Sequence, residues 1–306
     1  MAIIQTLGIA SNLGGPLNQY SNAAELLREN IHYYATELEH PQLQWHMVYP
    51  KRDGTKYAKL RHLNKTISQY TRYWSESNIP FLVIGGDHSC AMGIWSGVLQ
   101  SLKHQRDFGL IWLDAHMDAH TYFTSPTQNI HGMPIAALLG TTDKQLAHLY
   151  PGNKFIKPEN LVLMGIRSFE AQEYKLLKTR GIKIIFSDSI NDFSQNLLSV
   201  AQQLSLKTEI IGISIDLDFV EPLEAPGVAT PVAHGIKAQE LINALKLINR
   251  MPKIAGLEIS EFYPQSDKKN KTLELMKKII FTFYDRKRSY CQMWCMASSS
   301  GVLFLI

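Results

Sequence analysis

The sequence predicts an α/β fold: a single three-layer domain in which helices cover both faces of a mostly parallel, eight-stranded sheet. Two observations lead to this prediction. Short apolar runs rich in β-branched residues alternate with longer amphipathic stretches, as in a series of βαβ units. No linker rich in Pro, Gly or Ser and no internal repeat divides the 306 residues, so we expect one domain over 1–306, although the length would allow two.

The expected elements follow one another along the chain. Strands are expected at 3–9, 43–49, 81–84, 108–113, 161–166, 182–187, 210–215 and 254–259. The first helix is expected after Asn22, which would form a capping pair with Glu25. This helix would place Ala24, Leu27 and Ile31 on one face. Further helices are expected at 56–74, 192–204, 238–248 and 272–284.

Composition and charge exclude several classes of protein. With 45% hydrophobic and 19% charged residues, the chain is neither collagen-like, disordered nor a disulfide framework. Its net charge of +4 comes from dispersed residues, so we expect no nucleic-acid or membrane partner. Three cysteines favour a reducing compartment, and we find neither a signal peptide nor an apolar run that would span a bilayer. We therefore expect a cytoplasmic protein.

Polar residues follow four of the expected strands. They are Gly85-Gly86-Asp87-His88-Ser89, then Asp114-Ala115-His116-Met117-Asp118-Ala119-His120, then Asp216-Leu217-Asp218, and finally Glu261. In open α/β sheets, ligands bind outside the carboxyl ends of the strands. We therefore expect these side chains to share one crevice.

The spacing of these residues is typical of a metal site. Asp114, His116 and Asp118 are two positions apart, so an extended chain would point them to one side of the sheet, as it would Asp216 and Asp218. Crowded carboxylates raise one another's pKa unless a cation compensates. Mixed carboxylate and imidazole ligands favour manganese, although cobalt, nickel or iron would also bind. Four aspartates balance two divalent ions, which would activate a bridging hydroxide.

Each motif alone has a simpler interpretation. The Asp-x-His-x-Asp motif could be an exposed strand end, and Gly85-Gly86 could form only a tight turn. Glu261 could be a solvated residue after a strand. The metal interpretation gains weight because independent clusters follow separate buried strands, where ligands are expected.

Together these motifs resemble the ureohydrolase superfamily of arginases, agmatinases and formiminoglutamases, and most of all an arginase. The resemblance extends from about Phe81 to Phe283 and includes Pro222 and Ala225-Pro226-Gly227. It implies an arginase-like fold and a homo-oligomer, a trimer or hexamer. It also implies two Mn²⁺ ions, one held by His88, Asp114, Asp118 and Asp216, and the other by Asp114, His116, Asp216 and Asp218, with Asp114 and Asp216 bridging.

The resemblance also implies roles for residues outside the metal ligands. Glu261 would hold a substrate guanidinium through paired hydrogen bonds, and His131 would transfer a proton to the leaving amine. With the ligand Asp118, they are the expected catalytic residues. The reaction implied is the hydrolysis of L-arginine to L-ornithine and urea.

The residues expected to bind the rest of the substrate favour an amino acid. The 17 positions from Asp114 to His131 resemble the arginase length rather than that of agmatinases. The expected substrate-binding residues are His120, Ser125, Thr127, Asn129, Glu170 and Thr230. Two of them depart from the arginase pattern, since His120 replaces an asparagine and Glu170 an aspartate. His120 could contact the substrate carboxylate or be an exposed loop residue.

Other functions stay open at this point. An agmatinase, a formiminoglutamase or another guanidino-acid hydrolase would use the same metal ligands. An inactive, metal-binding relative with a regulatory role is a further alternative, although it would not need Glu261 and His131. The last residues, 285–306, are expected to form a C-terminal extension in which Cys291 and Cys295 are too few for a four-ligand metal site.

Overall fold

The computed structural model describes residues 3–31, 41–103, 107–141 and 143–285. Within these residues lie eight strands: β1 (Ile3–Ile9), β2 (Gln42–Val48), β3 (Phe81–Ile84), β4 (Phe108–Leu113), β5 (Leu161–Ile166), β6 (Lys183–Phe186), β7 (Ile210–Asp216) and β8 (Ile254–Ser260). Every strand begins and ends within one residue of its predicted bounds. The strands form one sheet in the order β2-β1-β3-β8-β7-β4-β5-β6, and every neighbouring pair is parallel.

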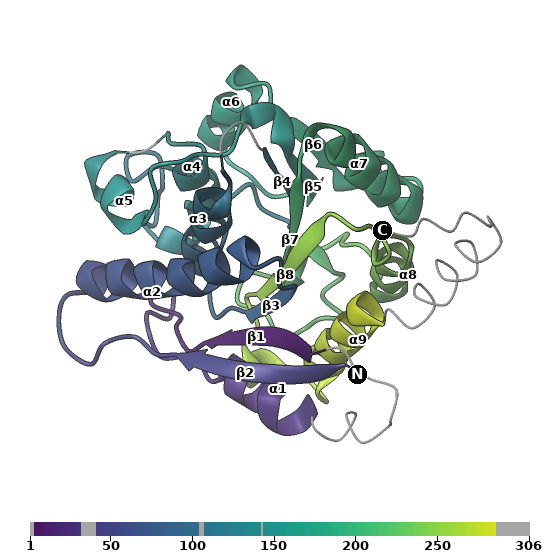
Figure 1. Ribbon diagram of the computed structural model, residues 1–306, viewed down its shortest axis with the longest axis horizontal. Helices are drawn as coiled ribbons and strands as arrows, with labels where there is room; N and C mark the ends of the chain where they lie inside the picture. The colour runs from purple at the N-terminus through teal and green to yellow at the C-terminus, as the bar shows by residue number, and fades with distance from the viewer. Residues whose placement is uncertain (1–2, 32–40, 104–106, 142, 286–306) are drawn as a thin grey trace, which may run out of the picture.

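Helices cover both faces of the sheet, which confirms the three-layer α/β fold (Figure 1). One buried cluster packs helices of the first layer against the sheet: α1 (Ala23–Ile31), α7 (Phe193–Lys207), α8 (Ala238–Ile248) and α9 (Lys271–Tyr284). The other cluster includes residues of α2 (Lys56–Glu76), α3 (Ala91–Ser101), α4 (Pro134–Leu138), α5 (Lys144–Leu149) and α6 (Ala171–Thr179). All residues of β3 and β4 are buried, as expected of strands covered on both faces.

Four helices were not predicted, and their sequences explain why. All but one residue of α3 is buried, so it lacks the polar face from which an amphipathic helix is recognised. The helices α4 and α5 have five and six residues, too few for a periodic pattern. A capping box formed by Glu170 and Glu173 starts α6.

Glu25, named above in the expected capping pair of the first helix, contacts two tyrosines. Glu25 of α1 accepts hydrogen bonds from the hydroxyls of Tyr20 and Tyr49, so its carboxylate ties the helix to neighbouring segments.

The expected C-terminal extension, with Cys291 and Cys295, lies outside the described residues apart from Asp285. Among the helices within the described ranges, none combines the length and the apolar character needed to cross a membrane.

Candidate metal centre and active site

Functional side chains gather where four central strands end. β3, β8, β7 and β4 are neighbours in that order, and they lead into His88, Glu261, Asp216 and Asp114. Asp216 is the last residue of β7, and His88 begins a single 3₁₀ turn after β3. Segments far apart in the sequence therefore meet at one edge of the sheet.

His88 lies at the centre of a first cluster of candidate metal ligands. Its Nδ1 is 3.3 Å from Oδ2 of Asp114, 3.2 Å from Oδ2 of Asp118 and 3.1 Å from Oδ2 of Asp216. All four side chains are buried. Their ligand atoms surround one position, as the ligands of a single metal ion do.

The orientation of the His88 ring fits metal binding. Ser214 donates its hydroxyl hydrogen to Oε2 of Glu258 at 2.8 Å, and that oxygen also accepts from the indole of Trp95 at 2.7 Å. The Ser214 oxygen, 2.8 Å from Nε2 of His88, must therefore accept from that nitrogen. A neutral His88 then turns its Nδ1 lone pair toward three carboxylates, which is favourable only with a cation between them. The donor set thus fits a divalent metal ion.

A second cluster adjoins the first through Asp114. Nδ1 of His116 lies 3.1 Å from Oδ2 of Asp218 and 3.6 Å from Oδ1 of Asp114. Asp114 is therefore shared by the two clusters, as a bridging ligand would be. Asp216 belongs to the first cluster only, and its Oδ1 accepts the backbone N–H of Asp218. Bridging by Asp216 stays a prediction.

The backbone brings these ligands together in a way that the spacing argument does not describe. β4 ends at Leu113, and Asp118 has a φ of +48°, so the Asp-x-His-x-Asp segment is not an extended strand. Asp218 lies in a 3₁₀ turn rather than on β7. Turns, and not the two-residue period of a strand, place these side chains. The left-handed conformation of Asp118 is uncommon for a residue with a side chain.

The crowding of carboxylates is visible in their pKa values. Burial and the charges of Asp218 and Asp114 raise the pKa of Asp216 well above its usual range. Burial and the charge of Asp114 raise the pKa of Asp118 to about 6. Burial lowers the pKa of His88, but hydrogen bonds to the surrounding carboxylates raise it well above its ordinary value. Without metal, protons thus supply positive charge to the cluster, and a metal ion would displace them.

Glu261 and His131 form a pair beside the metal ligands. Oε1 of Glu261 accepts the backbone N–H of His88 at 2.7 Å and lies 3.1 Å from Nδ1 of His131. Oε2 is buried and has no hydrogen-bond partner among the described residues. Although burial lowers it, the pKa of His131 is raised to about 9 by Glu261. Glu261 therefore offers one free carboxylate oxygen next to a protonated imidazole.

A cavity of about 210 Å³ opens beside the clusters. It is lined by His116, Asp118, Asp216 and His131 and by every residue expected to bind substrate: His120, Ser125, Thr127, Asn129, Glu170 and Thr230. The structure therefore brings the expected substrate residues together. His88, Asp114, Asp218 and Glu261 are not among the residues that line this cavity.

His120 is not an exposed loop residue. Its side chain is buried, with Nδ1 3.1 Å from Oγ1 of Thr124 and Nε2 3.0 Å from Oε2 of Glu170 and 3.3 Å from Oε2 of Glu173. Burial and a hydrogen bond to Glu170 raise the pKa of Glu173 to about 8. Glu173 also accepts the N–H of Ala119 at 2.9 Å, and it thereby fixes the start of the loop that carries His120.

Three hydroxyls of the cavity wall already have partners. Ser125 accepts the N–H of Gln128 at 2.9 Å, and Thr127 accepts that of Asn129 at 3.3 Å. Thr230 donates to Oδ2 of Asp218 at 3.0 Å. The first two hydroxyls keep their hydrogens free for another acceptor, whereas Thr230 orients a candidate metal ligand.

Sequence reasoning missed Glu173, Glu258 and Arg167. Glu258 is fully buried within β8, and a single charged residue in an otherwise apolar strand is a signal that could have identified it. Glu173 could have been found as the partner of Glu170 in a capping box. Nothing in the sequence shows that Arg167 donates to backbone carbonyls, because four of its five acceptors lie more than 50 positions away.

Comparisons with known proteins agree with this geometry. The model of the Arginase family matches residues 15–284. The arginase of Bacillus caldovelox is 36% identical over 208 residues, which are 67% of this chain and 69% of that protein, and the arginase of Bacillus subtilis is 34% identical over 238 residues, 75% and 79%. The native structure of the Bacillus caldovelox arginase superposes with a TM-score of 0.82 at 28% identity, covering 93% of this chain and 98% of that one. This chain therefore belongs to the arginase family.

Proposed function

We propose that the chain hydrolyses L-arginine to L-ornithine and urea, and that it does so with two Mn²⁺ ions. The observation that carries the proposal is the meeting of two carboxylate and imidazole clusters at Asp114, beside a polar cavity. Membership of the arginase family supports hydrolysis of a guanidino carbon–nitrogen bond. The ligands would be His88, Asp114, His116, Asp118, Asp216 and Asp218, a donor set that suits manganese and also accepts cobalt, nickel or iron.

The proposed chemistry divides between the metal ions and the chain. When bound, two divalent ions lower the pKa of a water molecule toward neutrality and so supply a hydroxide nucleophile at physiological pH. Glu261 would bind the guanidinium: it does not line the cavity itself but contacts His131, which does, and its free Oε2 can accept a charge-assisted hydrogen bond. Asp118 would hold a metal ion, and because it also lines the cavity, it would bring the chemistry of that ion next to the substrate.

His131 is the proposed proton donor. An amine leaves from a tetrahedral carbon only when it is protonated. Because Glu261 raises the pKa of His131 to about 9, the imidazolium persists at neutral pH, and its ring lines the cavity where the amine would leave. Its hydrogen bond to Glu261 also fixes its position relative to the guanidinium.

The far end of the cavity supports an amino-acid substrate. Ser125 and Thr127 can donate their hydroxyl hydrogens to a carboxylate, and the amide of Asn129 lies beside them. Glu170, whose pKa is lowered by hydrogen bonds from Glu173 and His120, supplies negative charge for an α-ammonium group. A site that hydrogen-bonds a carboxylate discriminates strongly against an amine that lacks one. We therefore propose arginine over agmatine.

Urea release tests this proposal. Purified protein is loaded with Mn²⁺, its metal content is measured, and equal concentrations of L-arginine, agmatine and formiminoglutamate are supplied. We expect urea from arginine, with about two ions per chain. Urea from agmatine or another guanidino acid alone would contradict the substrate, and formamide release would indicate a formiminoglutamase. No turnover and less than one ion per chain would indicate an inactive relative.

Two further expectations belong to the proposal. The chain is proposed to form a homo-oligomer, a trimer or hexamer, and to act in the cytoplasm, with no nucleic-acid or membrane partner. Light scattering after size-exclusion chromatography gives the mass of the assembly in solution. A mass near the 34.7 kDa of one chain would contradict the oligomer.

A further inference from the structure

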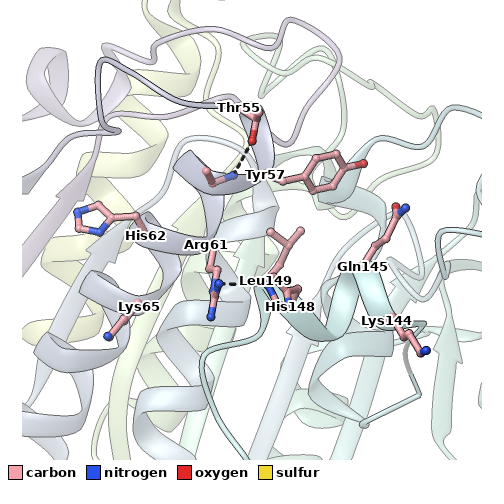
Figure 2. A pocket seen from close by; sticks show the side chains of 10 residues that line it. Thr55, Tyr57, Arg61, His62, Lys65, Lys144, Gln145, His148 and Leu149 are labelled. Carbon is pink, nitrogen blue, oxygen red and sulfur yellow. Dashed lines mark hydrogen bonds between the residues drawn. The ribbon is translucent and has the colours of Figure 1, made fainter.

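A second cavity, of about 720 Å³, lies between α2 and α5 and shares no lining residue with the cavity at the metal ligands (Figure 2). Five of its ten described lining residues carry basic side chains, three from α2 and two from α5: Arg61, His62, Lys65, Lys144 and His148. No acidic residue is among the ten. This concentration of one sign of charge stands out in a chain whose net charge is only +4.

Two of these basic groups contact each other. Nη1 of Arg61 lies 3.1 Å from Nε2 of His148, as the dashed line in Figure 2 shows. A guanidinium can only donate, so Nε2 of His148 accepts this hydrogen bond. Within the described ranges, none of the five basic side chains forms an ion pair with a carboxylate. The charges of Arg61, Lys65 and Lys144 therefore have no carboxylate partner there, and an anion would compensate them.

The acidic residue next to α5 does not compensate this charge. Asp143 precedes the helix, and its Oδ1 accepts the N–H groups of Gln145 and Leu146 at 3.0 and 2.9 Å. Its Oδ2 accepts the N–H of Tyr122 at 2.8 Å. The carboxylate is thus used to cap α5 and to hold the Tyr122 loop, and it does not line the cavity.

The remaining wall is partly apolar. Tyr57, Ala58 and Leu149 line it, and the ring of Tyr57 lies 6.4 Å from that of Tyr122, centroid to centroid. Burial and a hydrogen bond with Tyr122 raise the pKa of Tyr57 to about 12, so this phenol adds no negative charge. The cavity therefore offers an aromatic surface beside a group of cations.

We propose that the cavity binds a small molecule with a phosphate group, held by Arg61, Lys65 and Lys144, and with an aromatic ring against Tyr57. Phosphate is favoured because several cations surround one space and because a guanidinium fork matches the geometry of phosphate oxygens. A volume of about 720 Å³ also accommodates a ligand larger than a free anion. This site is separate from the proposed reaction and does not depend on it.

Calorimetric titration of the full-length, metal-loaded protein tests the site. Adenosine monophosphate is the probe, and adenosine is the matched neutral compound. We expect the monophosphate to bind and adenosine to bind at least about tenfold more weakly. The variant Arg61→Ala/Lys65→Ala should weaken binding of the monophosphate at least about tenfold. Lys246→Ala/Arg250→Ala, which removes the same two charges at the same spacing near the end of α8, should not change it.

Three results would overturn the proposal. They are the absence of binding, equal binding of adenosine, and equal loss of affinity in both double variants, which would indicate attraction by net charge alone. Arg61 and Lys65 are exposed, so both variants should keep the wild-type circular dichroism spectrum and Mn²⁺ content. Binding that survives in Arg61→Ala/Lys65→Ala but is lost on metal removal would place the probe at the metal ligands and would equally reject this site.

Discussion

Arg167 is bound to the carbonyl oxygen of Asp218 through its Nη2, at 2.5 Å. The same guanidinium donates to the carbonyls of Gly165, Phe219, Val232 and Ala233. It therefore ties the end of β5 to the turn that carries Asp218 and to the loop that follows Thr230.

Replacing Arg167 should destabilise the protein. In Arg167→Ala, several partly buried carbonyls lose their donor, and we expect the free energy of unfolding to fall by about 2 to 4 kcal/mol. Urea denaturation measures this change. Arg250→Ala, which removes an exposed arginine near the end of α8, is the control. An equal, small effect in both variants would contradict the assignment.

Removing the Ser214 hydroxyl should weaken metal binding. In Ser214→Ala, Nε2 of His88 loses its acceptor, so the ring no longer has a fixed orientation. We expect the metal affinity to fall by about 10- to 100-fold. Competition with a fluorescent chelator measures it. Ser260→Ala is the matched control, because that buried hydroxyl has no hydrogen-bond partner among the described residues, and its affinity should stay near wild type.

Replacing His131 should affect turnover far more than metal binding. In His131→Asn, a hydrogen-bond donor remains near Glu261, but no group can hold the proton for the leaving amine. We expect kcat for arginine to fall by about 10² to 10⁴-fold, with the Mn²⁺ content and KM little changed. Steady-state kinetics and metal analysis on one sample test this. A normal kcat would exclude His131 as the proton donor.

Metal removal should lower thermal stability. The buried carboxylates near His88 repel one another unless cations lie between them. A metal at 100 times its dissociation constant should add about 2.7 kcal/mol per site. We expect chelator treatment to lower the Tm of the wild type and to leave that of Asp216→Ala much less changed. Equal shifts in the two proteins would show that the stabilising metal binds elsewhere.

The strands could be predicted from the sequence because buried parallel strands are short apolar runs between polar turns. Two helices could not be predicted in this way. The helix α3 is almost wholly buried and has no polar face, and α6 starts at the capping box of Glu170 and Glu173. The candidate ligands were found because each lies at the end of a strand or in the segment after it. Their geometry was not, because Asp118 reaches His88 through a left-handed turn that spacing alone does not reveal.

The position of β8 in the sheet has a consequence for synthesis of the protein. β8 lies between β3 and β7, although among the described strands it comes last along the chain. Glu261, just after it, contacts the backbone of His88 across 173 positions of sequence. A ribosome must therefore release the chain as far as Glu261 before the central sheet can close, and we expect nascent chains to acquire metal only after that residue has emerged.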